Sequence, residues 1–187
     1  MKQLQDHGPL SRKFLELGCH CWQDAWSYIN QLPYRRVSDN SNFHLVLEEQ
    51  CGTCSTKHAL LVALAKEQNV PLALMVGLME MTMERFPALA SVFAKYHIDS
   101  MLETHCFLMF EKERLDVTFP QEITYPQASD YLEEWEITPE EIGSRKVKRH
   151  QEGMKRWMKE KNIPYPFEQV WKIREECIDR LSENTTS

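Results

Sequence analysis

The sequence lacks the features that mark several large classes of protein. Its 22 Lys and Arg are outnumbered by 28 Asp and Glu, which gives a formal net charge of −6, whereas nucleic-acid binders usually carry a basic excess. The first residues contain no apolar core of a secretory signal, and no apolar run approaches the roughly 20 residues of a membrane span. No loop carries the acidic pattern of a calcium site. We therefore expect a cytoplasmic protein that needs no metal or cofactor and binds neither nucleic acid nor membrane.

What the composition does contain is typical of a folded domain. Hydrophobic residues make up 42% and charged residues 27% of the 187 positions, which suffices for an ordinary core at this length. The six cysteines, with no secretory signal in view, indicate thiols in a reducing compartment rather than a disulfide framework. We expect a single domain over residues 1–187, and the oligomeric state stays open.

One short stretch, from Cys51 to Leu61, delivers a cysteine to the start of an apolar helix. Thr53 is a suitable N-cap, which places Cys54 in the first turn, and the helical pattern continues until Val70-Pro71 stops it. At that position the sulfur faces unpaired backbone N–H groups and the positive end of the helix dipole. Both favour the thiolate, which is the reactive form of cysteine. Cys54 is therefore the candidate nucleophile.

A nucleophilic thiol needs a base, and the base needs a group that orients it. Alternating residues at 103–110, a charged turn at 111–113 and strand-like residues at 114–118 predict a β-hairpin. His105 and Asp116 lie eleven residues apart on its two arms, so antiparallel pairing makes them near neighbours. The hairpin thus supplies a His–Asp pair, to which only the cysteine has to be added.

Together these features resemble the transglutaminase-like superfamily of papain-fold cysteine enzymes. The resemblance extends roughly from Tyr28 to Pro120 and is carried by these motifs: Gly52-x-Cys54, Ala59-Leu60-Leu61, Val70-Pro71, His105-x-Phe107 and Asp116-x-Thr118. It implies an α+β fold with a papain/transglutaminase-like core, in which the helix bearing the nucleophile packs on a small antiparallel sheet, with further helices at both ends. It also implies a catalytic triad of Cys54, His105 and Asp116.

The chain departs from the superfamily pattern beside each member of the triad. Many members carry an aromatic residue directly after the nucleophile, where this chain has Ser55. The histidine is often followed by Ala-Trp, here Cys106-Phe107, and the acid by Pro-Thr, here Val117-Thr118. The triad itself is kept, so these differences bear on the acyl donor and acceptor.

The chemistry that the resemblance implies is acyl transfer through a thioester on Cys54. The thiol attacks an amide or peptide carbonyl, ammonia or an amine leaves, and water or another amine resolves the thioester. The Cys54 backbone N–H is the expected oxyanion donor, and Gln50, four residues earlier, is a candidate second donor. An amide in a polar loop is, however, more often simply solvated. The expected substrate is a peptide, a protein or another amide, and the choice between hydrolysis and transamidation stays open.

Three alternatives use the same residues. A non-catalytic scaffold or binding module of this superfamily usually lacks a triad member, and here all three positions are filled. Cys51-x-x-Cys54 also fits a redox pair, regulatory or thioredoxin-like, but the thioredoxin fold needs a β-α-β unit before the motif and the segment here is helical. A four-thiolate zinc site would add Cys19 and Cys21, whose single intervening residue is a poor spacing.

The flanking sequence predicts helices around this core. An apolar stripe from Leu10 to Leu32 predicts one long helix that ends at Pro33, and the apolar run at 72–79 predicts a central strand. Residues 83–98 form an expected insertion with a short helix beside the cleft. His58 is expected to play a polar supporting role or to be exposed.

We place the core at residues 10–120 and a helical extension at 121–187. Within the extension, the acidic run from Asp130 to Glu141 is interpreted as helix surface, and Thr138-Pro139 is a helix start. A basic helix follows to about Lys161, and a last helix begins at Phe167.

Overall fold

The computed structural model describes residues 3–119 and 126–183, and within them the chain is an α+β protein. Its helices and strands follow in this order: α1 (Pro9–Glu16), α2 (Trp22–Gln31), α3 (Leu45–Glu49), α4 (Cys54–Glu67), β1 (Leu72–Thr82), α5 (Ala90–Tyr96), β2 (Ser100–Phe110), β3 (Glu113–Leu115), β4 (Tyr131–Ile137), α6 (Ser144–Glu160) and α7 (Phe167–Glu183). Short 3-10 helices at Pro87–Leu89, Ala128–Asp130 and Pro139–Glu141 precede α5, β4 and α6. In these two ranges no helix combines the length and the apolar character needed to cross a membrane.

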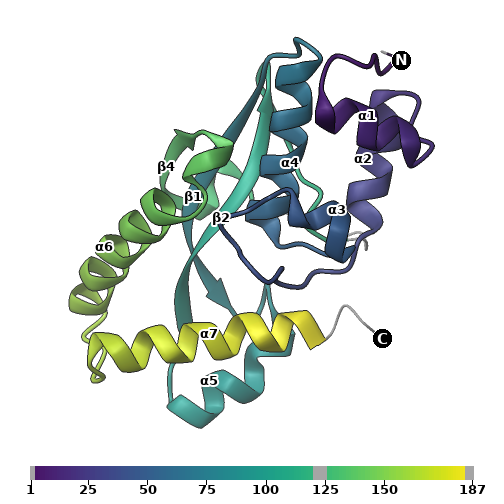
Figure 1. Cartoon of the computed structure of the whole chain (residues 1–187). Coiled ribbons are helices and arrows are strands. Elements are labelled where there is room, and N and C mark those ends of the chain that lie inside the picture. The colour runs from purple at the N-terminus through teal and green to yellow at the C-terminus, as the bar shows by residue number, and fades with distance from the viewer. Residues whose placement is uncertain (1–2, 120–125, 184–187) are drawn as a thin grey trace.

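A four-stranded antiparallel sheet in the order β3-β2-β1-β4 forms the centre of the molecule (Figure 1). β1 and β2 pair along their full eleven residues, from Leu72 opposite Phe110 to Thr82 opposite Ser100. β3 pairs only with the last three residues of β2. Among the described residues, no strand pairs with that edge of β2 at His105.

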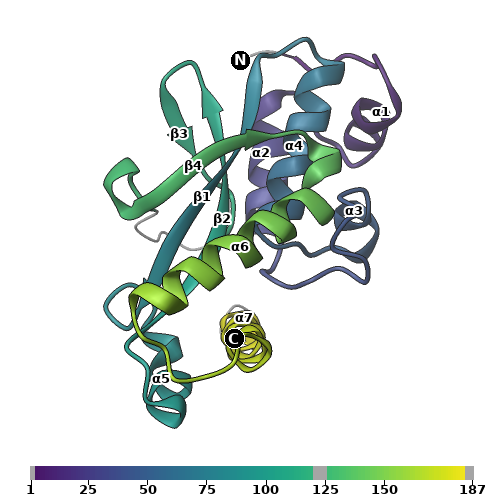
Figure 2. The same ribbon diagram turned by 90° about the vertical axis from the view of Figure 1, so that its left-hand side faces the viewer.

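α4 is the buried helix on which the sheet packs. It begins at Cys54 with Thr53 as its N-cap, and Thr56 Oγ1 accepts a hydrogen bond from the Thr53 N–H at 3.0 Å. Ten of its fourteen residues are buried, because the sheet lies on one side and α1, α2 and α3 lie on the other (Figures 1 and 2). The predicted start of this helix and its packing on an antiparallel sheet are confirmed.

The single long helix predicted from Leu10 to Leu32 is wrong. The chain forms two shorter helices, α1 and α2, and turns between them at Gly18, whose φ is +82°. Glycine takes this left-handed conformation without steric penalty. The apolar stripe runs across the break because both helices face the same core.

The region after residue 126 contributes a strand as well as helices. β4 pairs with β1 and forms an edge of the sheet, so the interpretation of the acidic run from Asp130 as helix surface is wrong. Trp135 and Ile137 are buried, whereas Glu134 and Glu136 between and beside them are exposed, which is the alternation of a half-buried strand. The expected boundary at residues 120 and 121 lies outside the described residues.

The two long C-terminal helices were predicted, and they belong to the same core as the sheet. α6 lies on the same face of the sheet as α4 (Figure 2), and a Cβ at Gly153 would lie 2.7 Å from Leu78 Cδ2 of β1. α7 crosses one end of the sheet and contacts α5 and β2 (Figure 1). Met154, Trp157 and Ile173 from these helices are buried in the central hydrophobic cluster.

Gly77, in the middle of β1, is a position where an added side chain has no room. It pairs with His105 on β2, and a Cβ there would lie 2.1 Å from Cδ1 of the Tyr131 ring. Gly77→Ala should therefore displace the ring and lower the free energy of unfolding by about 1–3 kcal/mol, measured by urea denaturation. In a Tyr131→Ala background the ring is gone and the same change should cost much less. An equal cost in both backgrounds would contradict this contact.

Candidate active site

Cys54 occupies the first position of α4 and is 7% exposed. The backbone before the helix packs closely against neighbouring side chains at Gly52. A Cβ at this position would lie 2.9 Å from Lys57 Cγ and 3.2 Å from Val46 Cγ2. The N–H groups of the first helical turn have no acceptor within the helix, so backbone donors and the positive end of the dipole lie near the sulfur. The sequence predicts this placement for a nucleophile.

His105 and Asp116 are hydrogen-bonded, as the predicted hairpin requires. His105 Nε2 lies 2.5 Å from Asp116 Oδ2. The hairpin turns at Glu111, which has a φ of +54°, and Asp116 follows directly after β3. Its other oxygen, Oδ1, accepts a hydrogen bond from the Thr118 N–H at 2.8 Å. The carboxylate is thus fixed at both oxygens, and Nδ1 is the imidazole nitrogen left for the thiol.

The charges of the three residues act on one another. Interaction with the Cys106 thiol lowers the pKa of Cys54 most, burial opposes this, and interaction with His105 lowers the pKa further, well below its usual range. Burial alone would lower the pKa of His105, but the Asp116 carboxylate and Cys54 raise it to about 10. Burial would raise the pKa of Asp116, yet the charge of His105 holds it far below its usual range. These directions describe a thiolate–imidazolium pair oriented by a carboxylate.

His58 connects the nucleophile helix to the turn that bears Asp116. Its Nδ1 donates to the Cys54 carbonyl oxygen at 2.7 Å, and its Nε2 accepts the Val117 N–H at 2.9 Å. Because an accepting Nε2 carries no hydrogen, the second bond places the ring hydrogen on Nδ1. Nε2 also lies 3.4 Å from Asp116 Oδ1. His58 is fully buried, which favours the predicted supporting role over exposure.

Lys57 is a second buried link, and the sequence reasoning missed it. Its Nζ donates to the carbonyl oxygens of Leu32, Val117 and Thr118, at 2.5, 3.3 and 2.9 Å. Burial lowers its pKa to about 8, although the Asp116 carboxylate acts in the opposite direction. The available signal was a charged residue within the otherwise uncharged run from Cys54 to Ala65.

The side chain of Gln50, the candidate second oxyanion donor, is held by other residues and does not line the cavity beside Cys54. It is exposed, with a left-handed backbone of φ +53°. Its Nε2 donates to the Leu47 carbonyl, and its Oε1 accepts from the Tyr28 hydroxyl at 2.7 Å. Both ends of the amide are thus engaged away from the nucleophile. The Cys54 N–H is left as the oxyanion donor from the predicted pair.

The structure holds the cysteines of the redox and zinc alternatives as free thiols. All six cysteines are free, and the Cys51 thiol donates to the Arg36 carbonyl at 3.8 Å. In residues 3–119 and 126–183 no three potential metal ligands cluster. The thiol beside the nucleophile is that of Cys106, whose pKa is raised by burial and by Cys54.

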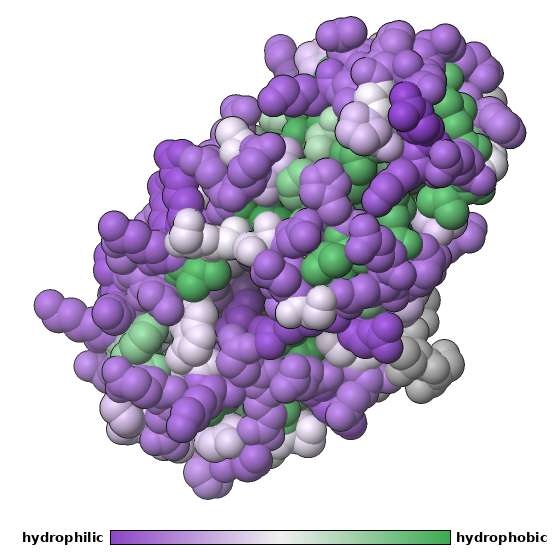
Figure 3. Space-filling model, viewed as in Figure 1, coloured by the Kyte–Doolittle hydropathy of each residue, from purple (hydrophilic) through white to green (hydrophobic). Residues whose placement is uncertain are grey.

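A cavity of about 1120 Å³ opens beside Cys54 and His105. Its other walls come from the end of β1, from Phe86, Pro87 and Ala88 of the insertion, and from α6 and α7. Figure 3 shows the surface hollowed between α6, α7 and the chain before α3. The insertion therefore lies beside the cleft as expected, and the C-terminal helices form one of its walls.

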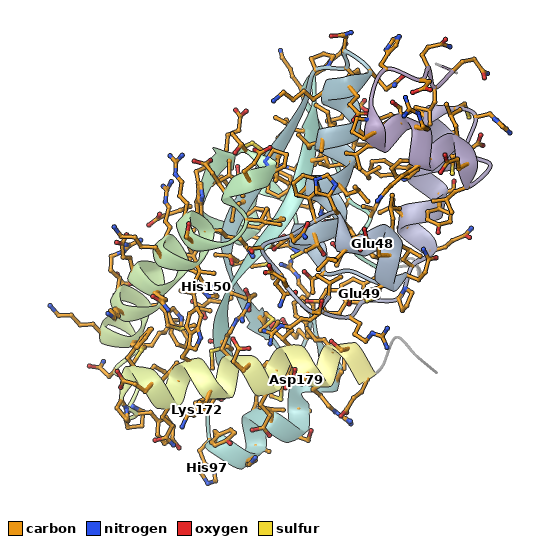
Figure 4. The ribbon with its side chains drawn as sticks, viewed as in Figure 1. Glu48, Glu49, His97, His150, Lys172 and Asp179 are labelled. Atoms are coloured by element: carbon orange, nitrogen blue, oxygen red, sulfur yellow. The ribbon has the colours of Figure 1, made fainter. Side chains whose placement is uncertain are left out.

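A buried charged cluster, which the sequence did not reveal, forms part of this wall. Arg174 of α7 contacts Glu103 of β2 through Nε at 2.5 Å and Nη2 at 2.8 Å. Burial would raise the pKa of Glu103, but the Arg174 charge holds it far below its usual range. His150, on the inner side of α6 (Figure 4), lies 3.7 Å from Glu103, and burial lowers its pKa to about 4.

The buried, neutral His150 predicts a loss of stability in mild acid. Its pKa is about 4 in the folded protein and about 6.5 in an unfolded chain. Between these values the unfolded chain binds more protons, so stability falls as the pH is lowered from 6.5 towards 4. We expect the free energy of unfolding, measured by urea denaturation, to decrease by about 2–3 kcal/mol from pH ~7 to pH ~4.5.

His150→Gln should flatten this dependence. The matched control is His97→Asn, because His97 is exposed at the end of α5 (Figure 4) and asparagine tolerates its left-handed φ of +50°. The control should show the same change in the free energy of unfolding with pH as the native protein. If the free energy of unfolding of His150→Gln depends on pH as strongly as that of the native protein, His150 is not the cause of the loss of stability in acid.

Comparison of the chain with protein-family models, with curated proteins and with solved structures finds no match in any of the three. The resemblance to the transglutaminase-like superfamily therefore stays a prediction carried by motifs, as does a papain-like core. What the structure shows is an α+β chain in which Cys54, His105 and Asp116 form one interacting group, with the first two at a cavity.

Proposed function

We propose that this chain is a cysteine-dependent acyltransferase or hydrolase that acts on amide or peptide carbonyls through a thioester at Cys54. The observation that carries the proposal is the hydrogen bond between His105 and Asp116 beside a cysteine at a helix N-terminus. A nucleophile, a base and an orienting acid are the parts that covalent acyl transfer needs. The order of these residues along the chain supports the likeness to transglutaminase-like enzymes.

In the first half-reaction the Cys54 thiolate attacks the carbonyl carbon of the bound amide. The carbonyl oxygen becomes an oxyanion, which the Cys54 backbone N–H stabilises at the helix N-terminus. As the C–N bond breaks, His105 donates its proton to the leaving nitrogen, and ammonia or an amine departs. Asp116 keeps the imidazole oriented throughout and stabilises its positive charge.

In the second half-reaction the now neutral His105 accepts a proton from the incoming nucleophile. Water yields a carboxylic acid, whereas an amine yields a new amide, and either step restores the Cys54 thiolate. The cavity admits both, so the proposal covers hydrolysis and transamidation. A non-catalytic scaffold would have no need for the paired ionisation of Cys54 and His105, and this favours an enzyme.

Cys54 should alkylate at lower pH than any other cysteine of the chain. Iodoacetamide labelling of native protein from about pH 5 to pH 9, quantified by peptide mass spectrometry, measures this for each thiol, because only the thiolate reacts. The other thiols are internal controls: burial raises the pKa of Cys19 and Cys106, and that of Cys177 to about 12. His105→Ala should slow the labelling of Cys54 by roughly tenfold or more below pH ~7. Labelling of Cys54 no faster than that of the other five would rule out the activated thiol.

Cys54→Ala should abolish turnover while the protein still unfolds cooperatively. The assay uses a panel of glutamine, asparagine and peptide amides, with and without an added primary amine, and measures ammonia release and product mass. A product carrying the amine shows transamidation, and a free acid shows hydrolysis. Full activity of Cys54→Ala on a confirmed substrate would refute the proposal.

A further inference from the structure

Lys146 is a buried cation at the candidate site that forms no direct ion pair among the described residues. The Glu103 carboxylate, which is bonded to Arg174, acts on it only through space. It lies on α6, is 8% exposed and lines the cavity beside Cys54. Its Nζ donates to Ser55 Oγ at 2.7 Å, and within residues 3–119 and 126–183 it forms no ion pair. Burying an ammonium without a counter-ion is costly, so such a placement indicates a role for the charge.

The other cations of the cavity wall are neutralised, which sets Lys146 apart. Arg36 contacts Glu175, Arg85 contacts Asp130, and Arg174 contacts Glu103 and Glu175. These pairs fix the walls and leave little net charge. The ammonium of Lys146 is directed instead at the residue that follows the nucleophile.

Ser55 connects this ammonium to the reacting sulfur. Its Oγ accepts from Lys146 Nζ, lies 3.5 Å from Cys106 Sγ and lies 4.0 Å from Cys54 Sγ. Because the ammonium can only donate, the hydroxyl hydrogen of Ser55 is left to point at one of the two sulfurs, and the raised pKa of Cys106 keeps that one a protonated thiol. The nearby acceptor is the Cys54 sulfur in its thiolate form.

We propose that Ser55 donates a hydrogen bond to the Cys54 thiolate and that Lys146 is a positioning residue that holds and polarises this hydroxyl. The proposal rests on the proposed function, because it concerns the activation of the same nucleophile. It gives Ser55 a role at the position where the resembled superfamily often carries an aromatic residue. It also makes α6 part of the active site.

The electrostatics of the site agree with this arrangement. After the Cys106 interaction, the opposing effect of burial and the effect of His105, the Lys146 charge is a further cause that lowers the pKa of Cys54. Other titratable groups act on this sulfur from every side: His105 and Cys106 on β2, Tyr34 before α3, Lys57 on α4 and Tyr131 on β4. The Lys146 charge also acts on the pKa of Cys106. Lys146→Arg, which keeps the charge, is therefore compared with Lys146→Met to isolate the effect of the ammonium.

The test is the pH profile of Cys54 alkylation by iodoacetamide in five variants, with thermal melts to establish folding. Lys146→Met removes the charge and should raise the pH midpoint of Cys54 labelling by about one unit. At any pH below that midpoint, labelling should then be roughly tenfold slower. Lys146→Arg keeps the charge and should retain most of the rate. The matched control is Lys148→Met, which makes the same change at an exposed site of α6 and should stay within about twofold.

Ser55→Ala tests the hydroxyl independently, and it does so even if Lys146→Met fails to fold. Ser55→Ala should slow the labelling of Cys54 by a similar factor. The double variant, Ser55→Ala with Lys146→Met, should label no more slowly than the slower of the two single variants, because both changes break the same chain of hydrogen bonds from Lys146 through Ser55 to Cys54. Equal rates in Lys146→Met and Lys148→Met, or an unchanged rate in Ser55→Ala, would overturn the proposal.

These outcomes are distinguishable from a failure of the proposed function. If native Cys54 labels at low pH in a His105-dependent way but is insensitive to Ser55 and Lys146, only the present inference falls. If native Cys54 shows no such reactivity, the proposed function falls and this inference with it.

Discussion

The geometry of the candidate site depends on one face of α4. Cys54, Lys57 and His58 stand at positions i, i+3 and i+4 of this helix, so they project from the same side. Lys57 and His58 both hold the backbone around Val117, directly after Asp116. The helix that presents Cys54 therefore also holds the segment that bears Asp116. The separation of these two residues is set by the single helical turn from Cys54 to His58.

This link joins segments that are far apart in the sequence. The Lys57 ammonium satisfies carbonyl oxygens from the end of α2 and from the turn after β3, and hydrogen bonds to a charged group contribute about 1.5–3 kcal/mol each. Leu32, Val117 and Thr118 are buried, so bulk water does not replace the donor at these carbonyls. The same contacts that close the core thus hold Asp116 against His105, which couples the stability of the fold to the order of the site.

The parts that could be predicted from the sequence are those fixed by local geometry. The start of α4 follows from Thr53 and the apolar run after Cys54, and the His105–Asp116 pair follows from a hairpin of eleven residues' separation. The break at Gly18 was missed because the apolar period continues through it. β4 was missed because its exposed glutamates are also what a helix surface would show.

The rest of the site depends on pairs that no local pattern encodes. Ser55 and Lys146 are 91 residues apart, and Glu103 and Arg174 are 71 apart. Each pair forms only after the sheet, α6 and α7 have packed together. Gln50 shows the converse: it precedes Cys54 by four residues, yet its amide is bonded to Leu47 and Tyr28.

The charge around Cys54 is opposite in sign to that of the chain as a whole. The protein carries a formal charge of −6, yet His105, Lys57 and Lys146 act on the sulfur while Glu103 and Glu175 are neutralised by arginines. At the surface, salt screens charges beyond about 8–10 Å, so the net charge influences mainly how a substrate approaches. Inside the cleft screening is weak, and the Cys106 thiol together with the nearby cations lowers the pKa of Cys54. An acidic protein can therefore favour a thiolate at Cys54, because the sulfur responds to the charges of its immediate neighbours and not to the net charge of the chain.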